Sequence, residues 1–261
     1  MEMFDAHCHL QEDVLFPNLG KIMERAAAVG VVRMAVCGTL PKDWPKVFQC
    51  MKKSKEFFSP LGKEKCALTQ SVGIHPWFVS KDWKKEFQSL EKDASMLSVG
   101  IGECGLDFQK RFTNRAEQEE CFRAHLDLAT TLDRPVAVHC VQAWGRMLEI
   151  LRDYPKPKKI LHAFGGAAEL IPELTELNCW FSFCGNVTNP NAKRVRAAVV
   201  EVPDDRLLVE TDAPDFPPLG CSKPNEPANL IHVVRAVSEF RKEPVEQIAA
   251  LTFANAERLF Q

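Results

Sequence analysis

Short apolar segments alternate with amphipathic segments along the chain. The apolar segments are rich in Val, Ile and Phe, are bounded by turn residues, and suit strands that are buried on both faces. They lie at residues 3–6, 31–36, 68–74, 97–101, 135–140, 159–164, 179–183 and 207–210. This spacing predicts eight parallel strands separated by helices.

The segments between these strands have helical patterns. Asn18 is a suitable N-cap for a helix that Gly30 would end. A helix over residues 114–132 would place Phe122 and Leu126 on one apolar face. Further helices are expected at residues 166–177, 191–200, 229–240 and 245–260, and the proline-rich segment 214–227 is expected to form a long ordered loop.

The alternation of strands and helices predicts a single-domain (β/α)8 TIM barrel over residues 1–261, and 261 residues is a normal length for that fold. The alternative fold is an open, doubly wound sheet. No G-x-G-x-x-G motif follows the first strand, which weakens a dinucleotide-binding version of that alternative.

Composition narrows the functional classes. Hydrophobic residues make up 46% of the chain and charged residues 26%, which allows a large core and excludes global disorder. A net charge of −2 argues against extensive electrostatic binding of duplex nucleic acid. It does not exclude binding of a short nucleic-acid segment at a site charged by metal ions.

The chain has no sequence signal for a membrane or for secretion. No apolar run approaches the roughly 20 residues of a membrane span, and the N-terminus lacks the features of a secretory signal. The ten cysteines are scattered without a C-x-x-C motif, as expected for reduced, buried thiols. We expect a monomer in the cytoplasm, with the nucleus as the alternative compartment and no membrane partner.

Polar side chains with metal-binding chemistry follow the predicted strands. In a barrel the active site is built at the carboxyl ends of the strands. At the end of the first predicted strand, Asp5, His7 and His9 should share the inward face, with Ala6 and Cys8 outward, because alternate residues of a strand point the same way. Four further candidates stand at other strand ends: Glu103, His139, His162 and Asp212.

Two histidines at the first strand end and these four residues together suit a pair of metal ions. Burying so many polar groups side by side without a ligand would be costly. Four imidazoles and two carboxylates exceed the usual ligands of one catalytic zinc, so we expect two ions with one bridging carboxylate. The donor atoms fit Zn, Mn, Mg or Co without choosing among them. The reaction class is then metal-assisted hydrolysis through a metal-activated water.

The motifs at the strand ends resemble the TatD family of metal-dependent deoxyribonucleases, among the amidohydrolase-type barrels. They are D-A-H-C-H at 5–9, V-G-I-H-P at 72–76, I-G-E-C-G-L-D-F at 101–108, V-H-C at 138–140, L-H-A-F-G-G at 161–166, E-T-D-A-P at 210–214 and N-E-P-A-N-L at 225–230. The resemblance covers nearly the whole chain. It implies a (β/α)8 barrel that hydrolyses DNA phosphodiesters with divalent metal ions, as a 3′-5′ exonuclease on short single-stranded ends.

The resemblance also implies a role for each ligand. His7 and His9 would hold the first ion, and His139 and His162 the second. Glu103 would bridge the two ions. Asp212 would bind the first ion and accept a hydrogen bond from the nucleophilic water, so that Asp212 and Glu103 are the expected catalytic residues.

Two stretches depart from the family pattern. Members commonly carry a basic or polar stretch after the fifth-strand histidine, and here Arg146 is the nearest cation to His139. Others carry an Arg before N-E-P, and here Lys223 and Pro224 stand in front of that motif. The residues that would bind phosphate therefore differ in this chain.

Other residues near the strand ends are candidates for contact with the substrate or for support of the metal ligands, and ordinary packing is the alternative for each. His75 is a candidate contact to the scissile phosphate, and Trp77 offers a stacking face for a base. Asp5, Asp107 and Glu210 are candidates to orient the metal ligands. His125 and His232 lie in helical patterns and are expected to be packing or surface residues, while Asn225 and Glu226 are expected to hold the late loop.

The candidate residues by themselves are compatible with three functions. The first is a phosphodiesterase acting on DNA ends, and the alternative is a metal-dependent barrel hydrolase of a small amide or ester. A non-catalytic binding protein is the third, and the complete ligand set counts against it. Fold analogy does not separate the first two. Amide hydrolases of this type often bridge their metals with a carboxylated lysine, so Glu103 favours the nuclease.

Overall fold

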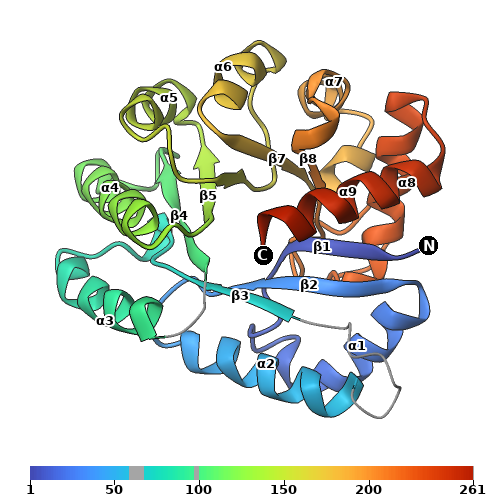
Figure 1. Cartoon of the computed structure of the whole chain (residues 1–261), viewed down its shortest axis with the longest axis horizontal. Coiled ribbons are helices and arrows are strands. Elements are labelled where there is room, and N and C mark those ends of the chain that lie inside the picture. The colour runs from blue at the N-terminus through green and yellow to red at the C-terminus, as the bar shows by residue number, and fades with distance from the viewer. Residues whose placement is uncertain (59–67, 97–99, 261) are drawn as a thin grey trace.

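Eight parallel strands form one sheet that runs in chain order and curves into a barrel (Figure 1). The computed structural model of the chain describes residues 1–58, 68–96 and 100–260. The strands are β1 (Met3–Cys8), β2 (Val31–Cys37), β3 (Leu68–Val72), β4 (Gly100–Asp107), β5 (Val136–Val141), β6 (Lys159–Leu161), β7 (Cys179–Phe183) and β8 (Leu207–Val209). The predicted (β/α)8 barrel is confirmed. A doubly wound sheet would need a reversal of strand order, and none occurs.

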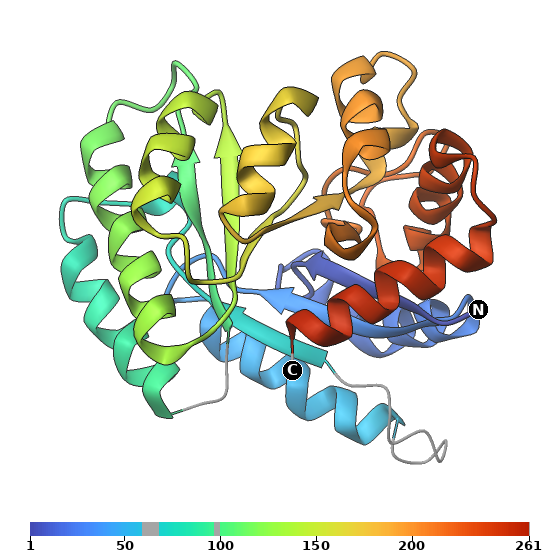
Figure 2. The same cartoon turned by 45° about the horizontal axis from the view of Figure 1, so that its top comes forward.

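Helices follow the strands and cover the outside of the barrel (Figures 1 and 2). They are α1 (Leu19–Ala28), α2 (Trp44–Phe58), α3 (Trp83–Met96), α4 (Arg115–Leu132), α5 (Trp144–Asp153), α6 (Ile171–Glu176), α7 (Lys193–Glu201), α8 (Leu230–Arg241) and α9 (Val245–Leu259). None of the helices in the described part of the chain is long and apolar enough to cross a membrane.

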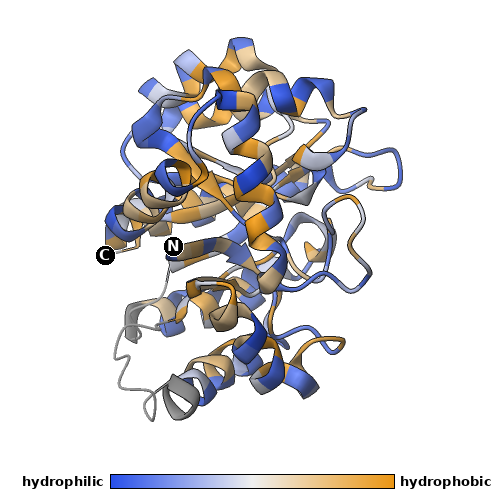
Figure 3. Ribbon diagram, turned by 90° about the vertical axis from the view of Figure 1, so that its right-hand side faces the viewer, coloured by the Kyte–Doolittle hydropathy of each residue, from blue (hydrophilic) through white to orange (hydrophobic). Residues whose placement is uncertain are grey.

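The apolar core has two parts. The larger part lies between the strands and the outer helices, and Figure 3 shows apolar residues concentrated on the central strands. The smaller part fills the barrel where the strands begin, and contains Phe4, Ile160, Trp180 and Leu208 together with the end of α9. α9 packs against β1 and β8 and closes this end of the barrel. The opposite end is therefore the one available for a site.

Hydrogen bonds beyond the end of β8 close the barrel against β1. The N–H of Asp212 donates to the carbonyl of His7 at 3.0 Å, and the N–H of His9 donates to the carbonyl of Ala213 at 2.7 Å. These two bonds place the residues after β8 directly beside the first strand end. Asp212 has a φ of 53°, a left-handed conformation that Asp tolerates better than most residues.

Several strands end earlier or later than the sequence pattern indicates. β3 stops at Val72 and β6 at Leu161, short of the predicted ends at residues 74 and 164. β4 continues to Asp107, and the first part of its predicted segment, residues 97–99, lies outside the described residues. At the end of β6 the chain turns with a φ of 43° at Ala163, which a continued strand would not permit.

The predicted helices are confirmed with one exception. Asn18 is the N-cap residue of α1, but its side chain makes no capping hydrogen bond, and Gly30 follows the end of the helix with a φ of 96°. The helix predicted over residues 166–177 is wrong in its first half, which is a 3-10 turn followed by α6. Pro172 explains the boundary, because proline is tolerated in the first turn of a helix but not inside it. The segment after β8 is a long loop, as predicted.

The expected outward direction of Ala6 in β1 is wrong. Ala6 does not point outward, since it lines the barrel interior together with His7. The register of β1 against β2 is irregular between Asp5 and Cys8, and such a bulge breaks the two-residue period. Cys8 does pack outside the barrel, in the larger core.

Candidate metal centre

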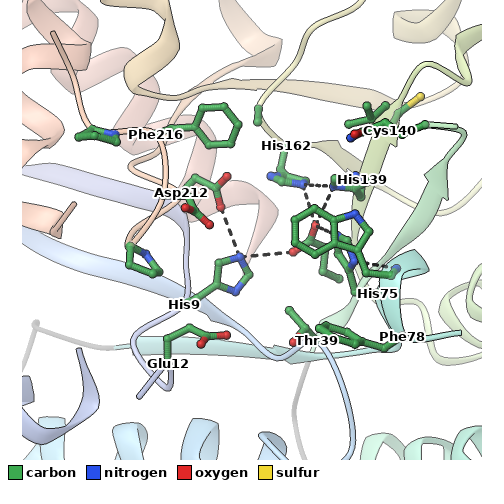
Figure 4. A pocket seen from close by; sticks show the side chains of 18 of the residues that line it. His9, Glu12, Thr39, His75, Phe78, His139, Cys140, His162, Asp212 and Phe216 are labelled. Atoms are coloured by element: carbon green, nitrogen blue, oxygen red, sulfur yellow. Dashed lines mark hydrogen bonds and ion pairs between the residues drawn. The ribbon is translucent and has the colours of Figure 1, made fainter. Parts of the chain in front are cut away.

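The six predicted ligands meet at the end of the barrel where the strands finish. His7 and His9 stand at the end of β1, Glu103 and His139 lie within β4 and β5, and His162 and Asp212 follow β6 and β8. Figure 4 shows His9, His139, His162 and Asp212 directed toward one another. Four of the six side chains are almost fully covered, while those of His9 and His139 are 12% and 11% exposed.

Glu103 stands at the middle of the cluster and divides its two oxygens between two groups of imidazoles. Its Oε2 lies 3.3 Å from His7 Nε2 and 3.4 Å from His9 Nε2. Its Oε1 lies 2.8 Å from His162 Nε2 and 3.1 Å from His139 Nδ1. A carboxylate with one oxygen toward each of two groups has the geometry needed to bridge two ions.

Asp212 completes the group around the end of β1. Its Oδ1 lies 3.3 Å from His9 Nε2 and 3.8 Å from His7 Nε2, and these two nitrogens are 3.3 Å apart. Three sets among the described residues bring their donor atoms close enough to hold a metal: His7, His9 and Asp212; His7, Glu103 and His162; and His75, Glu103 and His139.

The outward nitrogens of three imidazoles face oxygen atoms, and that of His9 makes a hydrogen bond. His9 Nδ1 donates to the Cys37 carbonyl at 2.7 Å. His139 Nε2 faces Asp107 Oδ2 at 3.5 Å, and His162 Nδ1 faces a carboxylate oxygen of Glu210 at 3.7 Å. When such a ring is neutral and keeps its proton on the outward nitrogen, the inward nitrogen has the lone pair that a metal ligand requires. The converging donor atoms therefore suit divalent metal ions.

The carboxylates of the centre are held in their ionised form. Burial alone would raise their pKa values, but the surrounding imidazoles lower the pKa of Asp212 to about 2 and hold that of Glu103 well below its usual range. Two buried negative charges at one point favour a cation between them.

Glycines in β4 allow this strand to approach β5 closely beside Glu103. A Cβ on Gly102 would stand 2.4 Å from the Ala137 carbonyl oxygen, and a Cβ on Gly105 would stand 2.1 Å from that of His139. Both glycines have positive φ values, 103° and 138°. Glycine is therefore required on both sides of Glu103, which explains the G-E-C-G motif.

His75 lies beside Glu103 but is oriented as a donor. Its Nδ1 accepts the N–H of Trp77 at 3.1 Å, so its proton is on Nε2, which stands 3.1 Å from Glu103 Oε1. Burial lowers the pKa of His75 to about 4, against the charge of Glu103, so the ring is neutral. A neutral imidazole with its proton toward the cluster donates a hydrogen bond and has no lone pair for a metal there.

Trp77 and Asp107 connect the rim of the site to His139. The indole Nε1 donates to Asp107 Oδ2 at 2.6 Å, and the Trp77 side chain is 45% exposed. Asp107 also accepts from the N–H of Gln109 at 3.0 Å. Although burial opposes it, the hydrogen bonds from His139 and Trp77 lower the pKa of Asp107 to about 2. The carboxylate that faces His139 is thus fixed in position and charge.

Asp5 and Glu210 contact backbone groups beside the ligands. Asp5 accepts the N–H of Thr211 at 2.8 Å and that of His7 at 3.4 Å, so it joins β1 to the residue before Asp212. Burial raises the pKa of Asp5 to about 7, although the hydrogen bonds from Thr211 lower it. Glu210 accepts the N–H of Ala163 at 2.6 Å and is fully buried below His162.

A cavity of about 730 Å³ opens above the ligands. Sequence reasoning did not find several of its lining residues: Glu12, Thr39, Phe78, Gln109 and Phe216. The Cys37 carbonyl was also missed, because a backbone acceptor has no sequence signal. Among the described residues lining the cavity, Lys223 is the one Lys or Arg. Phe216 had a weak signal, as an aromatic residue in a proline-rich loop.

The remaining predictions concern residues that hold the site together. Asn225 does hold the late loop, since its Nδ2 donates to the carbonyls of Thr211 at 2.9 Å and Asp215 at 2.8 Å. His125 is a buried packing residue. It donates from Nδ1 to the Cys121 carbonyl and accepts the N–H of Ile74, the residue before His75.

Comparison with known proteins places this geometry in a family. The sequence profile described as TatD related DNase matches residues 4–261. The chain is 33% identical over 268 residues to a Bacillus subtilis protein named "Uncharacterized metal-dependent hydrolase YabD", with 99% of each chain covered. It is 34% identical over 269 residues to an Erwinia amylovora protein named "3'-5' ssDNA/RNA exonuclease TatD", again with 99% of each covered.

Solved structures agree with this placement. The crystal structure of YjjV, a TatD homolog from Escherichia coli, has a TM-score of 0.88 at 26% identity and covers 99% of this chain and 97% of its own. A TatD family hydrolase of Entamoeba histolytica, at 19% identity, shows the same fold with a TM-score of 0.84 over 99% of this chain and 98% of its own. With a match of this extent, the chain belongs to the TatD family and is a metal-dependent hydrolase that acts on ester bonds.

Proposed function

We propose that this protein is a nuclease that removes nucleotides from the 3′ end of single-stranded DNA by hydrolysing phosphodiester bonds. The observation that carries the proposal is the division of the Glu103 carboxylate between two groups of imidazoles. Two-ion sites of this kind are common in enzymes that cleave phosphate esters. The direction and the single-stranded substrate are supported by relatives named 3′-5′ ssDNA/RNA exonucleases.

In this proposal His7, His9, Glu103 and Asp212 would hold one ion, and Glu103, His139 and His162 would hold a second. Bound ions would lower the pKa of the attacking water and neutralise charge on the phosphate oxygens. The nitrogen and oxygen donors suit Mg, Mn, Zn or Co.

Protein side chains then have distinct tasks around the phosphate. Asp212 is ionised and buried at the rim of the cavity, so it can accept the proton that the water loses. His75 carries its proton on Nε2 and lines the cavity, which suits donation to a phosphate oxygen. Trp77 exposes an indole face at the same rim for an unpaired base.

We further propose that one chain is active by itself, because all six ligands come from the same barrel. The nine cysteines in the described part of the chain are unpaired thiols, which favours a reducing compartment such as the cytoplasm.

The test is digestion of labelled oligonucleotides by protein that has been stripped of metal and then reloaded with Mg²⁺ or Mn²⁺. We expect stepwise shortening from the 3′ end of single strands, little cleavage of blunt duplex, and no activity before reloading. Glu103→Gln should lose activity, while Glu239→Gln, at an exposed position on α8, should keep it. Activity that survives verified metal removal, or that appears on amides or carboxylic esters but not on DNA, would overturn the proposal.

A further inference from the structure

Phe216 is an exposed aromatic side chain on the loop after β8, where it lines the cavity above the metal centre. It is 45% exposed, and its backbone has a φ of 46°. The left-handed region is unfavourable for a bulky residue, and a strained residue persists only when its surroundings hold it. The fold therefore keeps this ring at the surface, although both the exposure of an apolar side chain and the left-handed backbone conformation are unfavourable.

The loop around Phe216 is held from two sides. Asn225 Nδ2 donates to the carbonyls of Asp215 at 2.8 Å and Phe216 at 3.3 Å. On the other side, a Cβ on Gly185 would stand 1.9 Å from the Phe216 carbonyl oxygen, so the two backbones are in close contact. The N–H of Leu219 also donates to Thr188 Oγ1 at 2.7 Å. These contacts fix the backbone that carries the partly exposed ring.

Exposed aromatic rings stand on both sides of the metal ligands. Figure 4 shows Phe216 beside Asp212 and Phe78 beside His75, with the cluster between them. Trp77 and Phe78 are 45% and 42% exposed, close to the value for Phe216. A phosphate at the metal centre would therefore have an aromatic face within reach on either side.

We propose that Phe216 is a specificity-determining residue that stacks on one of the two bases flanking the scissile phosphate. This inference rests on the proposed nuclease function and adds the reason for its preference for single strands. A base in a duplex is stacked on its neighbours and paired, so its faces are not offered to a side chain. An unpaired terminal base can leave the stack and cover the ring. Stacking of this kind is sequence-tolerant, because every base has such a face.

The test compares wild type and Phe216→Ala on three single-stranded oligonucleotides: one with all bases, one abasic at the 3′-terminal nucleotide, and one abasic at the next. On the intact oligonucleotide we expect kcat/KM to fall by about 5- to 150-fold, the range for loss of one stacked base. On one of the abasic oligonucleotides the two proteins should be equally active. Phe216→Tyr should behave as wild type.

Leu219→Ala is the matched control, because Leu219 is 71% exposed on the same loop and does not line the cavity. It should leave all three rates unchanged. Metal content and melting temperature of the Phe216→Ala protein should match those of wild type. A loss that is the same on all three oligonucleotides, or no loss on the intact one, would overturn the inference. Failure of the wild type to cleave any oligonucleotide would instead overturn the proposed function.

Discussion

Substitution of Asp212 by Asn tests the proposed role of this carboxylate as acceptor of the proton from the attacking water. The fold should tolerate the change, because Asn accepts left-handed backbone conformations as Asp does, and the φ here is 53°. The N–H that closes the barrel onto the His7 carbonyl is unaffected. Glu210→Gln is the matched comparison, a second buried carboxylate two residues away that contacts the backbone of Ala163.

The expected magnitude follows from the charges around Asp212. Its pKa of about 2 keeps it ionised at any working pH, and Asn cannot accept a proton in its place. Loss of a general base lowers turnover by about 10²- to 10⁴-fold, which is roughly 3–5 kcal/mol in the barrier. The ion near His9 should also bind more weakly, because Asp212 Oδ1 stands 3.3 Å from His9 Nε2. Gln at position 210 retains an oxygen for the Ala163 N–H, so we expect less than about a tenfold loss there.

The assay is kcat on a single-stranded oligonucleotide at saturating Mn²⁺, with the metal content of each protein measured in parallel. Saturating metal separates the loss of the proton acceptor from weaker binding of the ion. Retention of oligonucleotide binding by the Asp212→Asn protein would show that the site is otherwise intact. Turnover by Asp212→Asn within threefold of wild type, or a larger loss in Glu210→Gln, would refute the assignment of the two carboxylates.

Three further predictions concern metal binding and stability. Elemental analysis of reloaded protein should find two divalent ions per chain, and a value of one would contradict the bridging role of Glu103. Asp107→Asn should lower the affinity for one of the two metal ions by about 10- to 100-fold in a calorimetric titration, because Asp107 Oδ2 faces His139 Nε2 at 3.5 Å and is expected to orient the ring. Unchanged metal affinity would exclude that role. Burial lowers the pKa of His125 from 6.5 to about 4, so the unfolded chain binds a proton that the folded chain does not, and stability falls as the pH drops from 6.5 toward 4. Between pH 7.5 and 5.0 the wild type should lose about 2 kcal/mol more unfolding free energy than His125→Gln, as measured by urea denaturation at both pH values; equal losses would place the proton elsewhere.

The sequence by itself determined the barrel and the six candidate ligands. Buried parallel strands produce apolar runs at regular spacing, so β1 to β8 were visible without structural information. A parallel barrel brings all strand ends to one face whatever the details of its packing. Residues as distant as His7 and Asp212 could therefore be placed in one site from their positions after strands.

The tertiary structure decided how those residues are arranged. The division of the Glu103 oxygens depends on the close approach of β4 and β5 at Gly102 and Gly105, and no local pattern encodes a distance between strands. The irregular register of β1 lets the consecutive residues Ala6 and His7 both face the barrel interior, because register is set by the neighbouring strand and not by the two-residue period.

The residues around the ligands were also decided by contacts between distant segments. The carbonyl of Cys37 determines that the proton of His9 lies on Nδ1. Contacts of Asn225 and Gly185 with the backbone of Phe216 determine where that side chain is exposed. A backbone carbonyl has no side-chain identity, and a strained φ arises only when separate loops pack together. Local sequence therefore identifies which groups can bind a metal, whereas the orientation, protonation and rim of the site depend on the folded chain as a whole.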